Sequence, residues 1–185
     1  MNNFYPGEGQ LIFVYGADMH PAQIGTRCLH PEVLNVARLP NHELAFFGHS
    51  KTWDGGQETV VACSGAEVWG VIYRLAYSDA DRLDAWKDVR MDGSGTYFHY
   101  PTDVFAPTGA PYPVLFYKKD VCGASQAPTE EHLAFIVAGA EARGLPTDYT
   151  ARLRRTPTRK ALYPVPKPIR FDRSVLAEGS CEGCC

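Results

Sequence analysis

The stretch Leu11-Ile12-Phe13-Val14-Tyr15-Gly16-Ala17-Asp18-Met19 is the part of this chain with the clearest structural meaning. Its first half predicts a buried strand, since short apolar runs rich in β-branched and aromatic residues favour strands. Its second half predicts a loop, in which Gly16 allows an anionic ligand to approach the backbone N–H groups. We therefore expect a strand that leads directly into a binding loop.

Further apolar and aromatic runs predict six more strands, at residues 33–39, 44–47, 59–63, 68–75, 97–105 and 114–117. Turn signals separate them, among them Pro40-Asn41, Asp54-Gly55-Gly56 and Ser64-Gly65. The nearly continuous apolar character of residues 68–73 indicates burial on both faces, at the centre of a sheet or inside a small barrel.

Helix signals are fewer. Ser78 precedes acidic residues in the manner of a helix cap, and Thr129 does the same before an apolar set that ends at Gly144. A shorter helix is indicated at residues 147–155. Because strands outnumber helices and do not alternate with them, the sequence predicts an α+β fold, a small mixed β-barrel or sheet with flanking helices.

Composition limits the classes of function. The chain has 185 residues, 45% of them hydrophobic, and a net charge of −3, which provides no general attraction for nucleic acid or an anionic membrane. It contains no apolar run long enough to span a bilayer and no signal-peptide pattern in its first residues. We expect a cytoplasmic protein with a small polar partner, built from a domain at residues 1–155 and a Pro-rich C-terminal arm at residues 156–185 laid over it.

A series of short motifs follows the first stretch in a fixed order: Ala37-Arg38-Leu39, Phe46-Phe47-Gly48, Trp53-Asp54-Gly55-Gly56, Val68-Trp69-Gly70-Val71, Leu83-Asp84, Gly95-Thr96-Tyr97 and Gly144-Leu145-Pro146. Over roughly residues 11–155, this series resembles the gamma-glutamylcyclotransferase family. The resemblance implies a barrel-like α+β domain that needs no cofactor in its pocket. It also implies a reaction in which the α-amine of a γ-glutamyl compound attacks its own side-chain carbonyl, releasing 5-oxoproline and an amine.

The same resemblance implies a pocket between the loop Tyr15–Met19 and residues 86–97. The expected substrate-binding residues are Tyr15, Gly16, Ala17, Asp18, Met19, Trp69 and Tyr97. Ala17 and Asp18 stand where the family has Ser and Asn, so a carboxylate replaces an amide beside the expected site. Asp18 can pair with the substrate's α-ammonium, or it can simply cap the segment that begins at Met19.

The family's catalytic Glu is missing from the matching positions. Counted from Leu83-Asp84 it falls on Lys87, and counted back from Tyr97 it falls on Arg90. The candidates for the proton carrier are Asp88, which lies about 100° further round the helix, and an unusually deprotonated Lys87. Asp84 and Asp92 are weaker candidates.

Two functions therefore remain open. One is a cyclising enzyme, and the other is a small-molecule binding protein that kept the pocket and lost the base. Lys87 and Asp88 can equally form an ordinary solvated helix end. If Lys87 instead fills the cavity and pairs with Asp18, the expected site is blocked in that form.

The remaining chemistry-bearing residues divide into two groups. The six histidines, at positions 20, 30, 42, 49, 99 and 132, lack metal-binding spacing and are expected to be surface or strand residues. Cys181, Cys184 and Cys185 form a terminal cluster that we expect to capture a soft metal ion or exchange thiols, with a disulfide or plain disorder as alternatives. The three other cysteines are scattered and are expected to be small hydrophobic residues.

Overall fold

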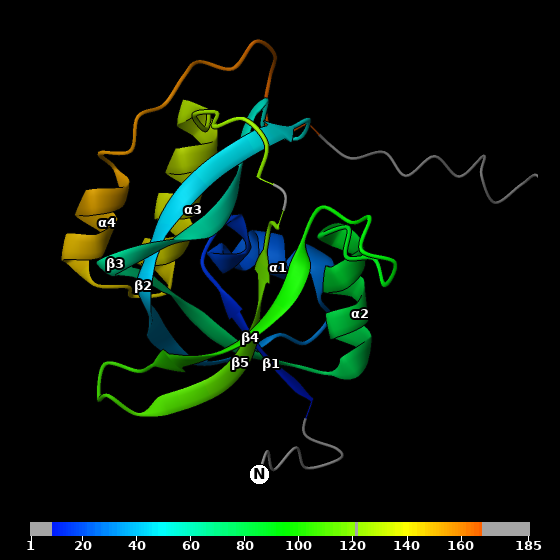
Figure 1. The fold of residues 1–185 in the computed structure, drawn as a ribbon, viewed down its shortest axis with the longest axis vertical. Coiled ribbons are helices and arrows are strands. Elements are labelled where there is room, and N and C mark those ends of the chain that lie inside the picture. Colours follow the sequence, from blue (N-terminus) through cyan, green and yellow to red (C-terminus); the bar gives the residue numbers. More distant parts are fainter. Residues whose placement is uncertain (1–8, 121, 168–185) are drawn as a thin grey trace, which may run out of the picture.

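A closed barrel forms the centre of the molecule, as a computed structural model that describes residues 9–120 and 122–167 shows (Figure 1). The barrel consists of β1 (Gln10–Val14), β2 (Glu32–Ser50), β3 (Gly55–Leu75), β4 (Phe98–Phe105) and β5 (Pro111–Lys118), in the order β1-β3-β2-β4-β5. All neighbouring strands are antiparallel except β1 and β5, which run parallel and close the ring. The predicted α+β barrel with flanking helices is confirmed.

Two long strands replace four of the predicted short ones. β2 and β3 pair along most of their length, and the register shifts between Pro40 and His42, where the sequence indicated a turn. Asn41 and Gly65, from the two expected turns, both have positive φ, and the Asn41 side chain accepts a hydrogen bond from the Gly65 backbone N–H. The prediction of separate strands was wrong, because these two turn signals lie opposite one another and form a single irregularity within the β2–β3 hairpin.

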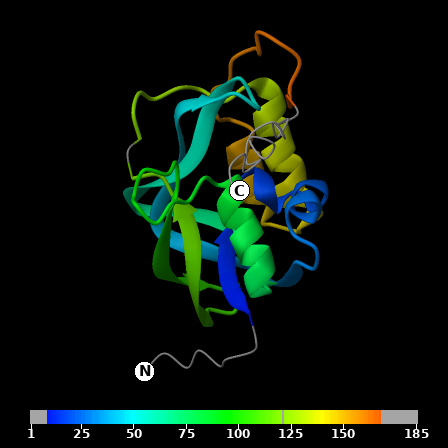
Figure 2. The same ribbon diagram turned by 90° about the vertical axis from the view of Figure 1, so that its right-hand side faces the viewer.

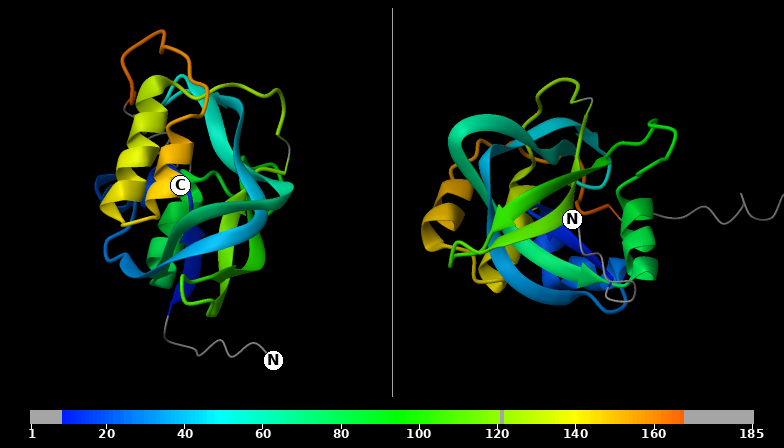
Figure 3. Two further views of the ribbon diagram at one scale, coloured as in Figure 1. Left: turned by 90° about the vertical axis from the view of Figure 1, so that its left-hand side faces the viewer. Right: turned by 60° about the horizontal axis from the view of Figure 1, so that its bottom comes forward.

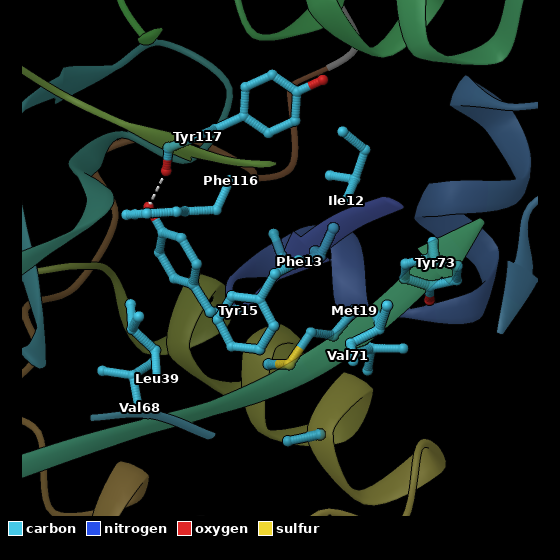
Figure 4. Close-up of a cluster of buried hydrophobic side chains, with 14 of the residues drawn as sticks. Ile12, Phe13, Tyr15, Met19, Leu39, Val68, Val71, Tyr73, Phe116 and Tyr117 are labelled. Atoms are coloured by element: carbon cyan, nitrogen blue, oxygen red, sulfur yellow. Dashed lines mark hydrogen bonds between the residues drawn. The ribbon is translucent and has the colours of Figure 1, made fainter. Parts of the chain in front are cut away.

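β1 lies between β3 and β5, and its side chains contribute to the core. Ile12 and Phe13 are fully buried, and Figure 4 shows them among Tyr15, Tyr73 and Phe116. Burial of apolar surface of this kind is the main source of stability in a domain of this size. The loop that follows β1 is therefore attached to a strand that is buried in the core.

The helices lie around the barrel. η1 (Ala17–Met19) is a 3-10 turn, and α1 (Pro21–Arg27), which we did not predict, begins with a proline and is capped by the His20 side chain. The others are α2 (Tyr77–Trp86), α3 (Glu130–Ala142) and α4 (Thr147–Leu153). α3 and α4 lie together on one side of the barrel and α2 lies on the other (Figures 1, 2 and 3). None of the helices in the described residues is both long enough and apolar enough to cross a bilayer.

Residues 156–167 return across the domain to the loop that joins β2 and β3. The Leu162 backbone N–H donates to Asp54 Oδ2 at 2.6 Å, and the Lys167 backbone N–H donates to the Thr52 carbonyl at 2.7 Å. Arg159 also pairs with Asp54. Cys181, Cys184 and Cys185 lie outside the described residues, so the metal or thiol-exchange role stays a prediction.

Candidate functional site

A cavity of about 310 Å³ opens between the loop after β1, the β2–β3 loop and the end of α2. Its lining brings together segments that are far apart in the sequence. The residues that line it are Ala17, Gln23, Arg27, His49, Ser50, Lys51, Thr52, Trp53, Gln57, Glu58, Trp86, Lys87 and Tyr97. The loop at Ala17 and the segment that carries Trp86, Lys87 and Tyr97 therefore face the same space.

Asp18 lies behind this cavity as a fully buried carboxylate. Oδ1 is 2.6 Å from Arg27 Nη1 and accepts a hydrogen bond from Gln23 Nε2 at 3.1 Å, and Oδ2 is 2.8 Å from Lys87 Nζ. Burial raises the pKa of Asp18, but Lys87 and Arg27 outweigh it and hold the pKa below its usual value. Asp18 is thus an ionised anchor for two cations, with both of its oxygens engaged by the protein.

Lys87, at the C-terminal end of α2, directs its ammonium group into the same cluster. Nζ lies 2.8 Å from Asp18 and 3.4 Å from Glu58 Oε1, and the side chain is 11% exposed. Burial lowers its pKa, whereas the two carboxylates raise it, and the net shift is upward. A deprotonated Lys87 is therefore disfavoured, and the ion pair with Asp18 that was expected to block the site is present.

Glu58 provides a carboxylate in the cavity wall that was not among the candidates from the sequence. It lies on β3 opposite Phe46, and it is 8% exposed. A side chain at Gly16 would place its Cβ 2.8 Å from Glu58 Oε1, so the carboxylate lies directly against the loop. The available signal was an acidic residue between Trp53-Asp54-Gly55-Gly56 and the apolar run that begins at Val60, but we began the predicted strand at Thr59.

The second oxygen of Glu58 faces a buried histidine. His132 Nε2, from α3, lies 3.4 Å from Glu58 Oε2, and the ring is fully buried. Burial raises the pKa of Glu58, but Lys87 and then His132 lower it, and the net shift is strongly downward. The prediction that the histidines are surface or strand residues is wrong for His132, because this residue lies on the buried face of α3.

Aromatic rings hold the cluster in place. The Trp53 ring stacks on His132 with centroids 4.8 Å apart and planes 8° apart. Tyr97 donates its hydroxyl hydrogen to the Glu58 carbonyl at 2.7 Å, and its ring lies 5.0 Å from Lys87 Nζ. An ammonium group near an aromatic face is further stabilised as a cation.

The structure places the other sequence candidates as follows. Tyr15 is buried and donates to the Tyr117 carbonyl at 2.5 Å, as Figure 4 shows. Met19 is buried in the core. Trp69 is half-buried and donates its indole N–H to Glu67 at 2.8 Å. These three do not line the cavity described above.

Asp88 follows Lys87 with a φ of 51° and is directed to its own loop rather than the cavity. Its Oδ2 accepts hydrogen bonds from the Thr96 hydroxyl at 2.8 Å and the Thr96 backbone N–H at 3.2 Å. Its Oδ1 is 2.8 Å from Arg90 Nε, and its side chain is 43% exposed. Asp84 forms hydrogen bonds with His99 and Tyr117, and Asp92 accepts a hydrogen bond from the Ser94 backbone N–H.

Comparisons with known proteins agree on one family. The AIG2-like family model matches residues 67–153. Gamma-glutamylcyclotransferases from Bos taurus and Homo sapiens are each 30% identical to this chain over 151 residues, which is 80% of this chain and 78% of theirs. A solved structure named gamma-glutamyl cyclotransferase has a TM-score of 0.78 and 28% identity, and the match covers 84% of this chain and 92% of that one.

Proposed function

The chain belongs to the gamma-glutamylcyclotransferase family, and on that premise we propose that it cyclises a small γ-glutamyl compound to 5-oxoproline, with Glu58 as the carboxylate that moves the protons. One observation carries the assignment to Glu58. Among the described residues that line the cavity, Glu58 alone bears a carboxylate. Asp88, the nearest acid in sequence to the family's Glu, has its oxygens bound to Thr96 and Arg90.

The reaction requires two protons to move. The α-nitrogen forms a bond to the γ-carbonyl carbon, and the bond from that carbon to the leaving nitrogen breaks. The two protons that the α-ammonium gives up are the two that the leaving nitrogen gains when it departs as an ammonium group. A single carboxylate beside both nitrogens can accept and return each proton in turn.

Lys87 controls how basic Glu58 is. Its ammonium lies 3.4 Å from Glu58 Oε1 and helps to keep the carboxylate ionised with a low pKa. A γ-glutamyl substrate brings an α-carboxylate that competes for this ammonium. When Lys87 turns to the substrate, Glu58 loses part of its stabilisation as an anion, and its pKa rises toward the range that a general base needs.

The test is the release of 5-oxoproline from a panel of γ-glutamyl amino acids and amines by three proteins: the wild type, Glu58→Gln and Asp88→Asn. Each substitution changes one carboxylate to its amide. We expect turnover by the wild type, a loss of about 10²–10⁴-fold in kcat for Glu58→Gln, and little change for Asp88→Asn. The opposite ranking of the two variants would show that Asp88 carries the proton and that our assignment is wrong.

A second candidate function has its own supporting observation. Lys87, at one of the two positions that the resemblance gives to the family's base, forms an ion pair with Asp18 at 2.8 Å, which favours a protein that binds a γ-glutamyl compound without cyclising it. The double variant Asp18→Asn, Lys87→Glu introduces the residues that the resemblance implies at these positions. If the wild type binds ligands by calorimetry without turnover and the double variant releases 5-oxoproline, the binding function is supported and the enzyme proposal fails.

A further inference from the structure

His132 is a buried polar residue beside Glu58, and the reaction described above gives it no role. It lies on α3, which begins at the Thr129 cap, and the Thr129 hydroxyl also donates to the Trp53 carbonyl at 2.9 Å. This bond fixes the start of α3 against the β2–β3 loop. The helix that carries the imidazole is therefore fixed to the β2–β3 loop, which carries Trp53.

Packing holds the ring in one orientation. One face stacks on Trp53, and the ring meets the Phe46 ring edge-on at 5.9 Å and 82°. Neither ring nitrogen has a hydrogen-bond partner of ordinary geometry within the described residues. Buried polar atoms in this condition are rare in folded proteins and call for an explanation.

Glu58 Oε2 is a charged atom that lies 3.4 Å from Nε2 of the ring. An ionised carboxylate can only accept a hydrogen bond, so Nε2 must carry a proton for the contact to be favourable. The distance exceeds that of an ordinary N–H···O bond, about 2.7–3.2 Å, and contacts of this kind in empty sites often shorten when a ligand binds.

This inference rests on the proposed role of Glu58: we infer that His132 is a positioning residue. Its Nε2–H holds Oε2, so that Oε1 stays on the side of Lys87 and the cavity. His132 is fully buried and does not line the cavity, so it acts through Glu58 rather than on the substrate. The groups that face or surround Glu58 are Tyr15 after β1, Asp18 on η1, Lys87 after α2, Tyr97 before β4, Lys119 after β5 and His132 on α3.

The kinetic test compares His132→Phe with His132→Gln in the full chain. Phe keeps a flat ring against Trp53 without a donor, whereas Gln supplies an N–H donor without the ring. We expect Phe to lower kcat at least tenfold with KM nearly unchanged and to move the acidic limb of the kcat–pH profile to higher pH. Gln should move that limb back toward the wild-type position.

A purely structural role for His132 predicts the reverse, in which Phe behaves like the wild type and Gln is the damaged variant. That result, or an acidic limb that does not move in His132→Phe, would overturn the inference. Thermal unfolding of each variant shows whether it folds.

Two measurements do not depend on turnover. Carboxyl ¹³C NMR of the ligand-free protein should show a higher pKa for Glu58 in His132→Phe than in the wild type, and ¹⁵N NMR of the wild type should show the proton on Nε2. An unchanged Glu58 pKa or a proton on Nδ1 alone would contradict the inference. If the wild type releases no 5-oxoproline while these NMR results are as expected, the proposed function fails and the inference about His132 stands.

Discussion

Lys87 Nζ lies 2.8 Å from Asp18 Oδ2. The family resemblance implies an Asn at position 18 and a Glu at position 87 or 90. The pair is nearly closed to solvent, with side-chain exposures of 11% and 0%. Glu58 lies on the other side of the same ammonium, at 3.4 Å. The carboxylate that lines this cavity in the described residues therefore comes from β3, and a lysine follows the end of α2.

The first prediction concerns the buried anchor. Asp18→Asn leaves Arg27 without its partner carboxylate and leaves Lys87 with Glu58 alone. Removing one member of a buried ion pair costs about 3–5 kcal/mol. We expect a loss of this size in the free energy of unfolding, measured with urea, whereas Asp81→Asn on the exposed side of α2 should stay within about 0.5 kcal/mol of the wild type. A small effect at Asp18 would contradict the assignment of an ionised buried carboxylate.

The second prediction is the acid dependence of stability. The pKa values of Asp18 and Glu58 are both lower in the folded protein than the ordinary values of these side chains, 3.8 and 4.5. Their contribution to stability is therefore complete above these values and is lost as the pH falls below them, because the unfolded chain then binds more protons. Urea unfolding between pH 6 and about pH 3 should show this loss.

The matched variant for this measurement is Glu58→Gln. It removes one of the two titrating groups, so its acid slope should be shallower by up to about 1.4 kcal/mol per pH unit. A slope identical to that of the wild type would show that Glu58 does not titrate differently in the two states.

The third prediction compares two glycines. A Cβ at Gly16 would lie 2.5 Å from Glu58 Cγ, whereas a Cβ at Gly25 on α1 would meet nothing within 4 Å. Gly16→Ala should cost about 1–3 kcal/mol through overpacking and should displace Glu58, so that kcat also falls. Gly25→Ala should be neutral or stabilising by up to about 1 kcal/mol, because alanine favours the helix. Equal effects in unfolding and turnover assays would argue against close contact between the loop and Glu58.

The fourth prediction concerns residues 156–167. Asp54, with φ 50°, accepts the Leu162 backbone N–H and pairs with Arg159, and it adjoins Trp53 in the cavity wall. Asp54→Asn keeps a residue that tolerates positive φ but removes the charge. We expect faster hydrogen exchange at the Leu162 amide and a higher KM with kcat nearly unchanged. Exchange that is no faster than in the wild type would show that this carboxylate does not hold the arm.

Local signals in the sequence predicted the fold class, and the family resemblance implied that the loop after β1 and residues 86–97 enclose a pocket. The apolar stretch at residues 11–15 predicted β1, and the motif order predicted that the loop after it and residues 86–97 belong to one fold. Such signals depend on residues close together in the chain, where periodicity and turn chemistry act. They failed for the β2–β3 hairpin, because two turn signals that lie opposite each other become one irregularity only after the strands have paired.

Only the tertiary structure decided which carboxylate faces the cavity. Glu58 meets Lys87, 29 residues away, because β3 closes against β1 and the end of α2 reaches the same opening. His132 joins them from α3, although nothing in its own neighbourhood of the sequence distinguishes it from a core residue. Asp88 is adjacent to Lys87 in the sequence, but its backbone has φ 51° and its carboxylate is bound to Thr96. Electrostatic partners are set by distance in space, and the sequence alone specifies distance only along the chain.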